Sequence, residues 1–403
     1  MKRIDCRIPE GMQDTLPGEC LRKRQMEQAL RGLFAHHGYQ EIETPLLEYY
    51  RVMDDEAFGF PETHVFKTFD RRGRVLAIRP DSTIPAVRMA ASRLSETLLP
   101  LRLCYMQSAA TYRMDTLSAL CEGTQAGVEL MGEGGPYADA EIIALAVEAL
   151  KAAGLRDFQL DVGQVAFFTG FMEEAGLNGK QAERIARFVD DKNMLGMDLY
   201  LKEQGLPDEI TRKLGKLTQL YGDEGILNEA EKMTRNATCL GAIHNLKQVR
   251  DILYAYGLMD YISFDLGMVG GINYYSGMIF RGITPHLGQP LLSGGRYDGL
   301  PGAFGRDMPA TGFALSVKLL MIALEQQGEV FSNPQTDIVL GFDREALKEA
   351  LYYAGQMRAE GKTVALLYDG ARETLKAHLN AGRAKKAVFV TAEAIEIMAG
   401  GCA

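Results

Sequence analysis

The sequence lacks any apolar run near the length of about 18 residues that a membrane-spanning helix needs. Its first stretch, MKRIDCRIPEGMQDTLPG, is polar and has no apolar core of the length found in signal peptides. Both absences argue against a membrane-spanning or secreted protein. We therefore expect a cytoplasmic protein without a membrane partner.

Patterns typical of disulfides and metal sites are also missing. The sequence has no C-x-x-C pair, and its histidines form neither H-x₃-H nor H-E-x-x-H. The six cysteines are scattered along the chain, at Cys6, Cys20, Cys104, Cys121, Cys239 and Cys402. Such spacing favours reduced thiols over a disulfide framework or a zinc site. We expect neither a structural metal nor a cofactor.

No Walker motif occurs, and no G-x-G-x-x-G follows a strand-like run. A glycine pair, Gly270–Gly271, does lie in the stretch GMVGGINYYSGMIF, residues 267–280. The pair has four possible meanings: a phosphate loop, a tight turn, the floor of a pocket, or a place where another residue has been lost. Because the pair does not open a helix, no helix dipole can hold an anion there, which disfavours the phosphate loop.

Positive charge is scarce where a phosphate-binding site would need it. The formal net charge is -9. Between Arg113 and Lys151 no Lys or Arg occurs, whereas acidic residues recur throughout that stretch. Triphosphates and RNA need positive charge or a metal to offset their phosphates. The tail over residues 335–403 has no excess of basic residues either, and we expect no nucleic-acid partner.

The length of 403 residues indicates two or three domains, and a content of 47% hydrophobic and 24% charged residues is typical of a soluble globular chain. We predict a core over residues 1–331, which contains a helical insertion at about 174–260. SNPQTD, residues 332–337, has the turn residues of a linker. Residues 338–403 alternate strand and helix, which predicts a small α/β domain with a largely parallel sheet.

Apolar spacing predicts further elements of the core: a helix over 18–38, a strand-like segment over 39–50, a hairpin over 64–79, a strand-like run over 262–280 and a final helix over 312–324. Arg72–Gly73 is the predicted turn of the hairpin. Pro45 cannot donate to a strand ladder, so it predicts a strand edge or a strand end.

Polar residues recur inside the predicted strands. Gln125 and Glu129 are four residues apart, so on a strand they point to the same face. From spacing alone, a structural polar network or a solvated face is favoured. The alternative is a pocket for a small zwitterion, in which carboxylates meet an ammonium, an arginine meets a carboxylate and tyrosines flank the side chain. The candidate residues are Asp81, Thr83, Arg113, Gln125, Glu129, Tyr274 and Tyr275.

Several longer motifs follow one another along the chain: PEGMQDTLP, GYQEIETPLLEY, IRPDSTIPAVR, ATYRMD with TQAGVELMG, GGINYYSGMIF, and LLSGGRYDGL with ATGFALSVKLL. In this order they resemble the core of class II aminoacyl-tRNA synthetases, and within that class the histidine branch. The resemblance implies an α+β fold with an antiparallel sheet flanked by helices. It also implies that residues 338–403 are a shortened anticodon-binding domain that stops after its third strand.

The same resemblance implies a histidine pocket at the candidate residues, although Asp81 stands where the synthetases have a longer glutamate. The departures concern ATP. Gly270 stands where synthetases carry an arginine that supports adenylate formation, and Lys318 and Leu319 replace the Glu-Arg of the third class motif. The loop of the second motif is shorter and lacks basic residues. Loss of one such guanidinium typically costs about 10²–10³-fold in rate, so we expect no catalytic residues and no adenylation.

A synthetase-like core that keeps its amino-acid site and loses its ATP chemistry resembles the regulatory-subunit family of ATP phosphoribosyltransferase. That resemblance implies a non-catalytic partner of a short-form catalytic subunit at the first step of histidine biosynthesis, with histidine as allosteric feedback inhibitor. It implies homodimers within a hexameric-type or larger hetero-oligomeric glycosyltransferase. Two alternatives stay open: a divergent, active histidyl-tRNA synthetase, and a stand-alone paralogue that activates or senses another amino acid.

Overall fold

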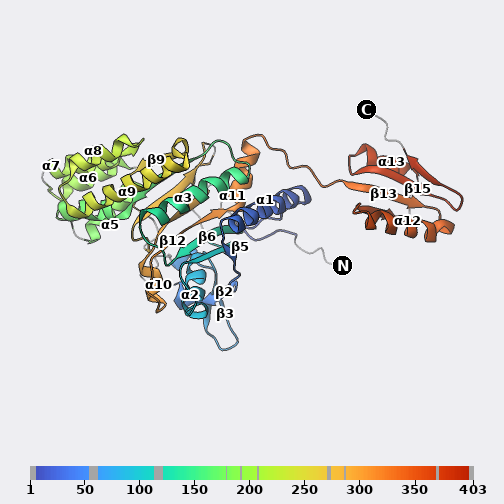
Figure 1. Ribbon diagram of the computed structural model, residues 1–403, viewed down its shortest axis with the longest axis horizontal. Coiled ribbons are helices and arrows are strands. Elements are labelled where there is room, and N and C mark those ends of the chain that lie inside the picture. Colours follow the sequence, from blue (N-terminus) through green and yellow to red (C-terminus); the bar gives the residue numbers. More distant parts are fainter. Residues whose placement is uncertain are drawn as a thin grey trace. The chain divides into compact units, whose positions relative to one another are not determined.

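The computed structural model describes residues 6–53, 62–112, 121–177, 179–190, 193–206, 208–269, 274–285, 287–368 and 372–398 (Figure 1). The chain divides into two compact units. The larger unit consists of Met1–Asp14 and Gln25–Glu329, and the smaller one consists of Thr15–Arg24 and Val330–Ala403.

A nine-stranded sheet forms the frame of the larger unit. Its strands are, in spatial order, β1 (Gln40–Glu41), β5 (Leu101–Ala110), β6 (Glu122–Met131), β12 (Ala310–Ser316), β11 (Leu292–Arg296), β10 (Met278–Ile283), β7 (Gln159–Gln164), β9 (Ile262–Asp265) and β8 (Tyr221–Gly222). Neighbouring strands from β5 to β7 are all antiparallel, as the resemblance implied. Parallel pairs extend the sheet on both sides, because β1 pairs with β5 and β9 pairs with β7 in parallel.

Helices cover this sheet (Figure 1). The central one is α3 (Gly135–Ala152), which is rich in alanine and branched aliphatic residues and packs against both β12 and α9 (Ala237–Tyr256). The next helix along the chain, α4 (Val165–Glu174), also packs on α9, and α11 (Val317–Gln326) packs on β6. Phe34, near the end of α1 (Pro17–His36), meets Phe313 of β12 edge to face. The predicted helix over 18–38 is thus confirmed.

A small antiparallel sheet precedes α2 (Thr83–Arg93) in the chain. It consists of β2 (Leu47–Tyr49), β4 (Val75–Ile78) and β3 (Lys67–Phe69), which confirms the predicted hairpin. Gly73 has a φ of 77°, a conformation that glycine adopts without steric cost. Pro45 lies between β1 and β2, which belong to different sheets, so the prediction of a strand end is also confirmed.

The predicted insertion over residues 174–260 is mainly helical. It contains α5 (Gly179–Asp190), α6 (Met194–Glu203), α7 (Asp208–Leu217) and α8 (Gly225–Met233), followed by α9. The short strand β8 interrupts these helices and pairs with β9. Two further helices belong to the larger unit. They are α2 (Thr83–Arg93) and α10 (Gly299–Ala303), which pack together over one hydrophobic core.

Two predictions of local structure are wrong. Residues 262–280 do not form one strand, since β9 ends at Asp265, β10 begins at Met278, and β7 lies between them in the sheet. The final helix begins at Val317, because residues 312–316 belong to β12. In both cases pairing with distant strands decides the structure, and an apolar run alone does not reveal its partners.

The smaller unit has a four-stranded sheet in the order β14 (Val364–Leu367), β13 (Thr336–Phe342), β15 (Ala384–Val390) and β16 (Ile395–Met398). The strand β13 pairs in parallel with both β14 and β15, which confirms the predicted parallel sheet. The expected end after the third strand is wrong, because β16 adds an antiparallel edge.

Helices cover both faces of this smaller sheet, with α12 (Leu347–Ala359) on one side and α13 (Arg372–Asn380) on the other (Figure 1). Successive residues of β13 point to opposite faces. Leu340 packs with Ala350 of α12, and Val339 packs with Leu375 of α13. In the described part of both units, no helix is long and apolar enough to cross a membrane.

Candidate functional site

Two buried carboxyl groups form the centre of the candidate site. Asp81 lies in the loop before α2 and is 7% exposed, and Glu129 on β6 is 0% exposed. Asp81 Oδ1 accepts hydrogen bonds from the backbone N–H groups of Thr83 at 2.7 Å and Ile84 at 3.3 Å. The carboxyl group therefore occupies N–H groups that the first turn of α2 leaves without a helical partner.

Gln125 joins β6 to the start of α2. Its Nε2 donates to Asp81 Oδ2 at 3.3 Å, and its Oε1 accepts from the N–H of Ser82 at 2.8 Å. Gln125 and Glu129 lie four residues apart on one continuous strand, which places them on the same face, as predicted. The structure thus brings Asp81, Gln125 and Glu129 into one cluster.

Two tyrosines that the sequence did not reveal hold Glu129. Tyr105 of β5 donates its hydroxyl proton to Glu129 Oε1 at 3.1 Å, and the Tyr297 hydroxyl donates to Oε2. Thr83 Oγ1 lies 3.4 Å from the Tyr105 hydroxyl oxygen, so Thr83 belongs to the same network. The polar network is therefore satisfied largely from within.

A glycine in the sequence, Gly127, could have indicated that a bulky side chain such as Tyr105 lies against this strand. Gly127 stands opposite Tyr105 in the register of β5 and β6, between Gln125 and Glu129. A Cβ atom on Gly127 would lie 2.5 Å from the Tyr105 hydroxyl oxygen. A glycine inside a strand often marks such a close approach. Gly312 plays the same part for Glu129, since a Cβ atom there would lie 2.0 Å from Oε2.

Aromatic rings border the carboxyl cluster. The ring centroids of Tyr274 and Tyr275 are 5.0 Å apart, and those of Tyr274 and Tyr297 are 5.8 Å apart in an edge-to-face arrangement. Tyr297 therefore connects the predicted tyrosine pair to Glu129. Gly295 leaves room for Tyr275, because a Cβ atom on Gly295 would lie 2.9 Å from that ring.

The electrostatics of the cluster favour a cationic ligand. Burial raises the pKa of Glu129 to about 8, and the hydrogen bond from Tyr297 opposes this only in part. Burial also raises the pKa of Asp81, against the hydrogen bond from Gln125. Neither carboxyl group forms a salt bridge with any residue that the structure describes. Two buried carboxyl groups without a cation are most strongly stabilised by a ligand that supplies one.

Three other positions singled out in the sequence have different outcomes. Arg113 and Gly270 lie outside the described residues. Leu319 lies half-buried in the first turn of α11, and its N–H donates to Ser316 Oγ at 3.3 Å. Because Ser316 pairs with Gln125 across β12 and β6, α11 begins beside the Gln125 end of the cluster.

Comparison with known proteins places the chain in a family. A family model described as histidyl-tRNA synthetase matches residues 11–320. The ATP phosphoribosyltransferase regulatory subunit of Acetivibrio thermocellus is 41% identical over 362 residues, which is 90% of this chain and 87% of that protein. The chain belongs to the ATP phosphoribosyltransferase regulatory subunit family. The regulatory subunit of Ruminiclostridium cellulolyticum is 38% identical over 360 residues, 89% of this chain and 86% of that protein.

A solved structure supports the same grouping. It comes from Bacillus halodurans, is described as an ATP phosphoribosyltransferase regulatory subunit/histidyl-tRNA synthetase, and is 32% identical to this chain. The two structures agree with a TM-score of 0.86 over 98% of this chain and 100% of the other. This member of the regulatory subunit family therefore has the α+β, class II synthetase-like fold that its motifs predicted.

Proposed function

We propose that the chain is the non-catalytic regulatory subunit of ATP phosphoribosyltransferase in histidine biosynthesis. It acts with a short-form catalytic subunit, and histidine is its feedback effector. The names of the relatives support the regulatory role, because the alignment with the first of them, at 41% identity, covers 90% of this chain. The candidate site carries the assignment of the effector.

One observation carries this assignment: Asp81 and Glu129 are buried carboxyl groups without a described cationic partner, next to a pair of tyrosines. The ammonium group of an amino acid supplies the missing charge, and a planar imidazole fits beside tyrosine rings. In this proposal Thr83 and Gln125 fix the two carboxyl groups, Tyr274 and Tyr275 flank the side chain, and Arg113 meets the ligand's carboxylate.

The proposed function does not include adenylation, because Leu319 replaces an arginine of the synthetase pattern. A leucine at the start of α11 has neither the charge nor the planar guanidinium that would stack on ATP and offset its phosphates. Gly270 removes a second arginine of the synthetase pattern. With both groups lost, the expected adenylation rate falls by several orders of magnitude, since each alone typically contributes about 10²–10³-fold.

The mechanism that we propose is allosteric. Histidine binds with different affinities to two states of a hetero-oligomer, and this difference changes the activity of the catalytic subunit. Homodimers of this chain form part of a hexameric or larger assembly, and RNA has no role in it. The smaller unit is a shortened relative of the synthetase anticodon-binding domain, and the larger unit is the synthetase-like core.

The test is an activity assay with a purified short-form catalytic subunit. We expect activity only when this chain is added, and inhibition by histidine. Asp81→Asn and Glu129→Gln should leave activation in place and weaken inhibition by roughly tenfold or more, because each removes a carboxyl group with which the ammonium group of the ligand pairs. The exposed carboxyl variant Asp198→Asn is the matched control and should behave as the wild type.

Failure to activate the catalytic subunit would refute the regulatory role. Activation without any effect of histidine would refute only the assignment of the effector. Histidine-dependent exchange of pyrophosphate into ATP, at rates typical of a synthetase, would instead identify a divergent histidyl-tRNA synthetase.

A further inference from the structure

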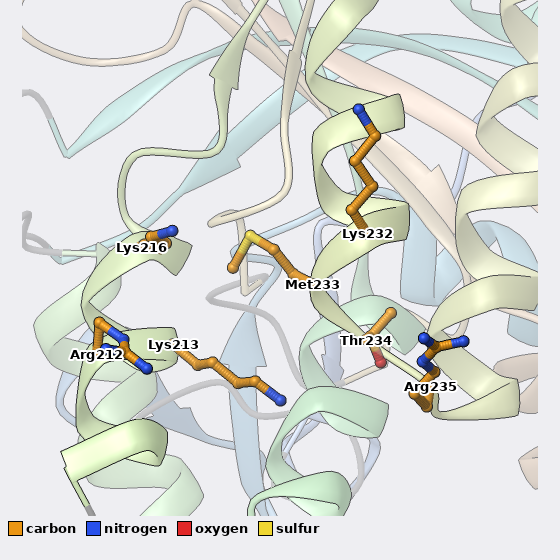
Figure 2. Close-up of a pocket in the computed structure, with 7 residues that line it drawn as sticks. All are labelled: Arg212, Lys213, Lys216, Lys232, Met233, Thr234 and Arg235. Atoms are coloured by element: carbon orange, nitrogen blue, oxygen red, sulfur yellow. The ribbon is translucent and has the colours of Figure 1, made fainter.

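The helical insertion carries a pocket that the proposed function does not use. Its volume is about 270 Å³, and its lining consists of Arg212, Lys213, Lys216, Lys232, Met233, Thr234 and Arg235. Figure 2 shows that the cations come from two sides, from α7 and from α8 with the loop that follows it. Every charged side chain in the lining is positive.

Most of this positive charge has no salt-bridge partner among the residues that the structure describes. Lys213 Nζ lies 3.4 Å from Glu174 Oε1, and Glu174 Oε2 accepts from the N–H groups of Arg235 and Asn236, each at 3.2 Å. Glu174 is therefore already bound to Lys213 and to the backbone at the start of α9. Among the described residues, no salt bridge is formed by the side chains of Arg212, Lys216, Lys232 or Arg235.

Favourable interaction with a helix dipole explains the positions of only some of these cations. Lys216 and Lys232 lie in the last turns of α7 and α8, where the helix dipole favours positive charge. Arg212 lies four residues before Lys216 on α7, at a spacing where like charges repel each other. Arg235 precedes the start of α9, where a cation is disfavoured. Arg212 and Arg235 thus stand where the local structure opposes them.

The rest of the lining gives the pocket a floor. Thr234 is buried and Met233 is half-buried, whereas Arg212, Lys216, Lys232 and Arg235 are exposed at the rim. In Figure 2, Lys213 extends from α7 toward the α8 side, and Met233 extends from α8 toward α7. A concave site lined by one sign of charge concentrates ions of the opposite sign.

The volume and the charge of the pocket together limit the kinds of ligand that it can bind. About 270 Å³ is near the lower end of small-molecule sites, which usually begin at about 300 Å³. A single phosphate group carries about -1.5 to -2 charges at neutral pH, less than can be offset by the four cations that form no salt bridge with a described residue. Arginine and lysine are the side chains that proteins use for phosphate groups.

We propose that this pocket binds a compact anion with two or more phosphoryl groups. Pyrophosphate, tripolyphosphate and nucleoside triphosphates share this chemistry. The inference rests on the pocket alone and does not depend on the effector site or on the regulatory role. RNA is the rival ligand, but a bounded pocket in a chain with a net charge of -9 favours a small anion over an extended backbone.

The test compares the wild type with two charge-matched triple variants. The pocket variant is Arg212→Gln/Lys216→Gln/Arg235→Gln, and the control is Lys180→Gln/Lys202→Gln/Lys348→Gln, which changes exposed residues outside the pocket. Calorimetric titrations at about 0.1 M salt, where exposed charges are partly screened, use pyrophosphate, tripolyphosphate, orthophosphate and metal-free ATP. Thermal melting followed by circular dichroism establishes that each variant is folded.

We expect one saturable site for pyrophosphate and tripolyphosphate, with affinity at least about tenfold above that for orthophosphate. The pocket variant should weaken this binding by about tenfold or more, since charged hydrogen-bond partners are lost, and the control by less than about twofold. Tighter binding of ATP than of tripolyphosphate would identify a nucleotide, and the reverse order an inorganic chain; both orders support the proposal.

Three results would overturn the proposal. One is the absence of saturable binding of any of these anions by the wild type. Another is an equal loss in both triple variants, which would indicate a general charge effect. The third is an oligouridylate of about 12 nucleotides that displaces pyrophosphate at lower concentration and loses affinity in the pocket variant, which would identify an RNA surface.

Discussion

Glu129 shows how one residue combines a structural cost with a binding role. It accepts hydrogen bonds from Tyr105 and Tyr297 inside the sheet, and burial raises its pKa to about 8. The same carboxyl group in an unfolded chain has a pKa near 4.3. Between these values the folded chain keeps a proton that the unfolded chain has released. The free energy of unfolding therefore falls as the pH rises through this window.

The first prediction concerns the variant Glu129→Gln, which cannot titrate. Between pH 5 and pH 8 the wild type should lose a few kcal/mol of stability relative to the variant, at up to about 1.4 kcal/mol per pH unit. Urea denaturation at four pH values measures this difference. The exposed control Asp198→Asn should follow the wild type, and an unchanged pH dependence in Glu129→Gln would contradict the prediction.

The residues that could be predicted share a local rule or a motif. Gln125 and Glu129 were placed on one face by the period of a strand, and Asp81 and Thr83 by their motif before a helix. Tyr105 and Tyr297 were not predicted, because they reach Glu129 from other parts of the chain. Their position depends on which strands pair and in which register, and a period of two does not specify either.

At the scale of elements, the starts of α2 and α11 use serine in different ways. Ser316 caps α11 with its side chain, which accepts from the N–H of Leu319. Ser82 occupies the corresponding position of α2, but its hydroxyl is buried and has no hydrogen-bond partner among the described residues. Asp81 provides the side-chain acceptor there instead.

The second prediction compares alanine at these two positions. Ser316→Ala should lose about 1 kcal/mol of stability, since a capping hydrogen bond disappears. Ser82→Ala should gain about 1 kcal/mol, because it removes a buried polar atom that is unsatisfied in the free protein. Chemical denaturation of both variants at pH 7 measures the difference. Equal destabilisation by the two substitutions would show that Ser82 is not an idle cap.

Elements were predictable where their own periodicity defined them, as in the hairpin over 64–79 and the helices of the insertion. The prediction for residues 262–280 was wrong because the apolar residues of this run belong to two strands, β9 and β10, which have β7 between them in the sheet. Residues 312–316 failed because an apolar GFALS fits either a strand or a helix, and pairing with β6 and β11 selects the strand.

At the scale of the whole molecule, the proposed role requires that the effector site and the catalytic partner influence each other. A ligand shifts an equilibrium between assembly states only by its difference in affinity for them. Coupling of this kind is reciprocal. Whatever lowers catalytic activity when histidine binds must also lower histidine affinity when the catalytic subunit holds its substrates.

The third prediction is therefore a shift in histidine affinity. Titration calorimetry of the complex should give a histidine Kd about 5- to 150-fold weaker with saturating substrates than without them, which corresponds to about 1–3 kcal/mol of coupling. Glu129→Gln should show weak binding under both conditions. Equal affinities for the wild type under both conditions would rule out the allosteric mechanism while leaving the activating role in place.

Asp81 has a double use whose consequence reaches beyond the site. One carboxyl group holds the N–H groups of Thr83 and Ile84 and also faces the proposed ligand. A bound cation keeps this carboxyl group ionised, and an ionised carboxylate is the stronger acceptor. Ligand binding should therefore strengthen the hydrogen bonds in the first turn of α2. Hydrogen–deuterium exchange at the amides of Thr83 and Ile84 should slow when the effector binds.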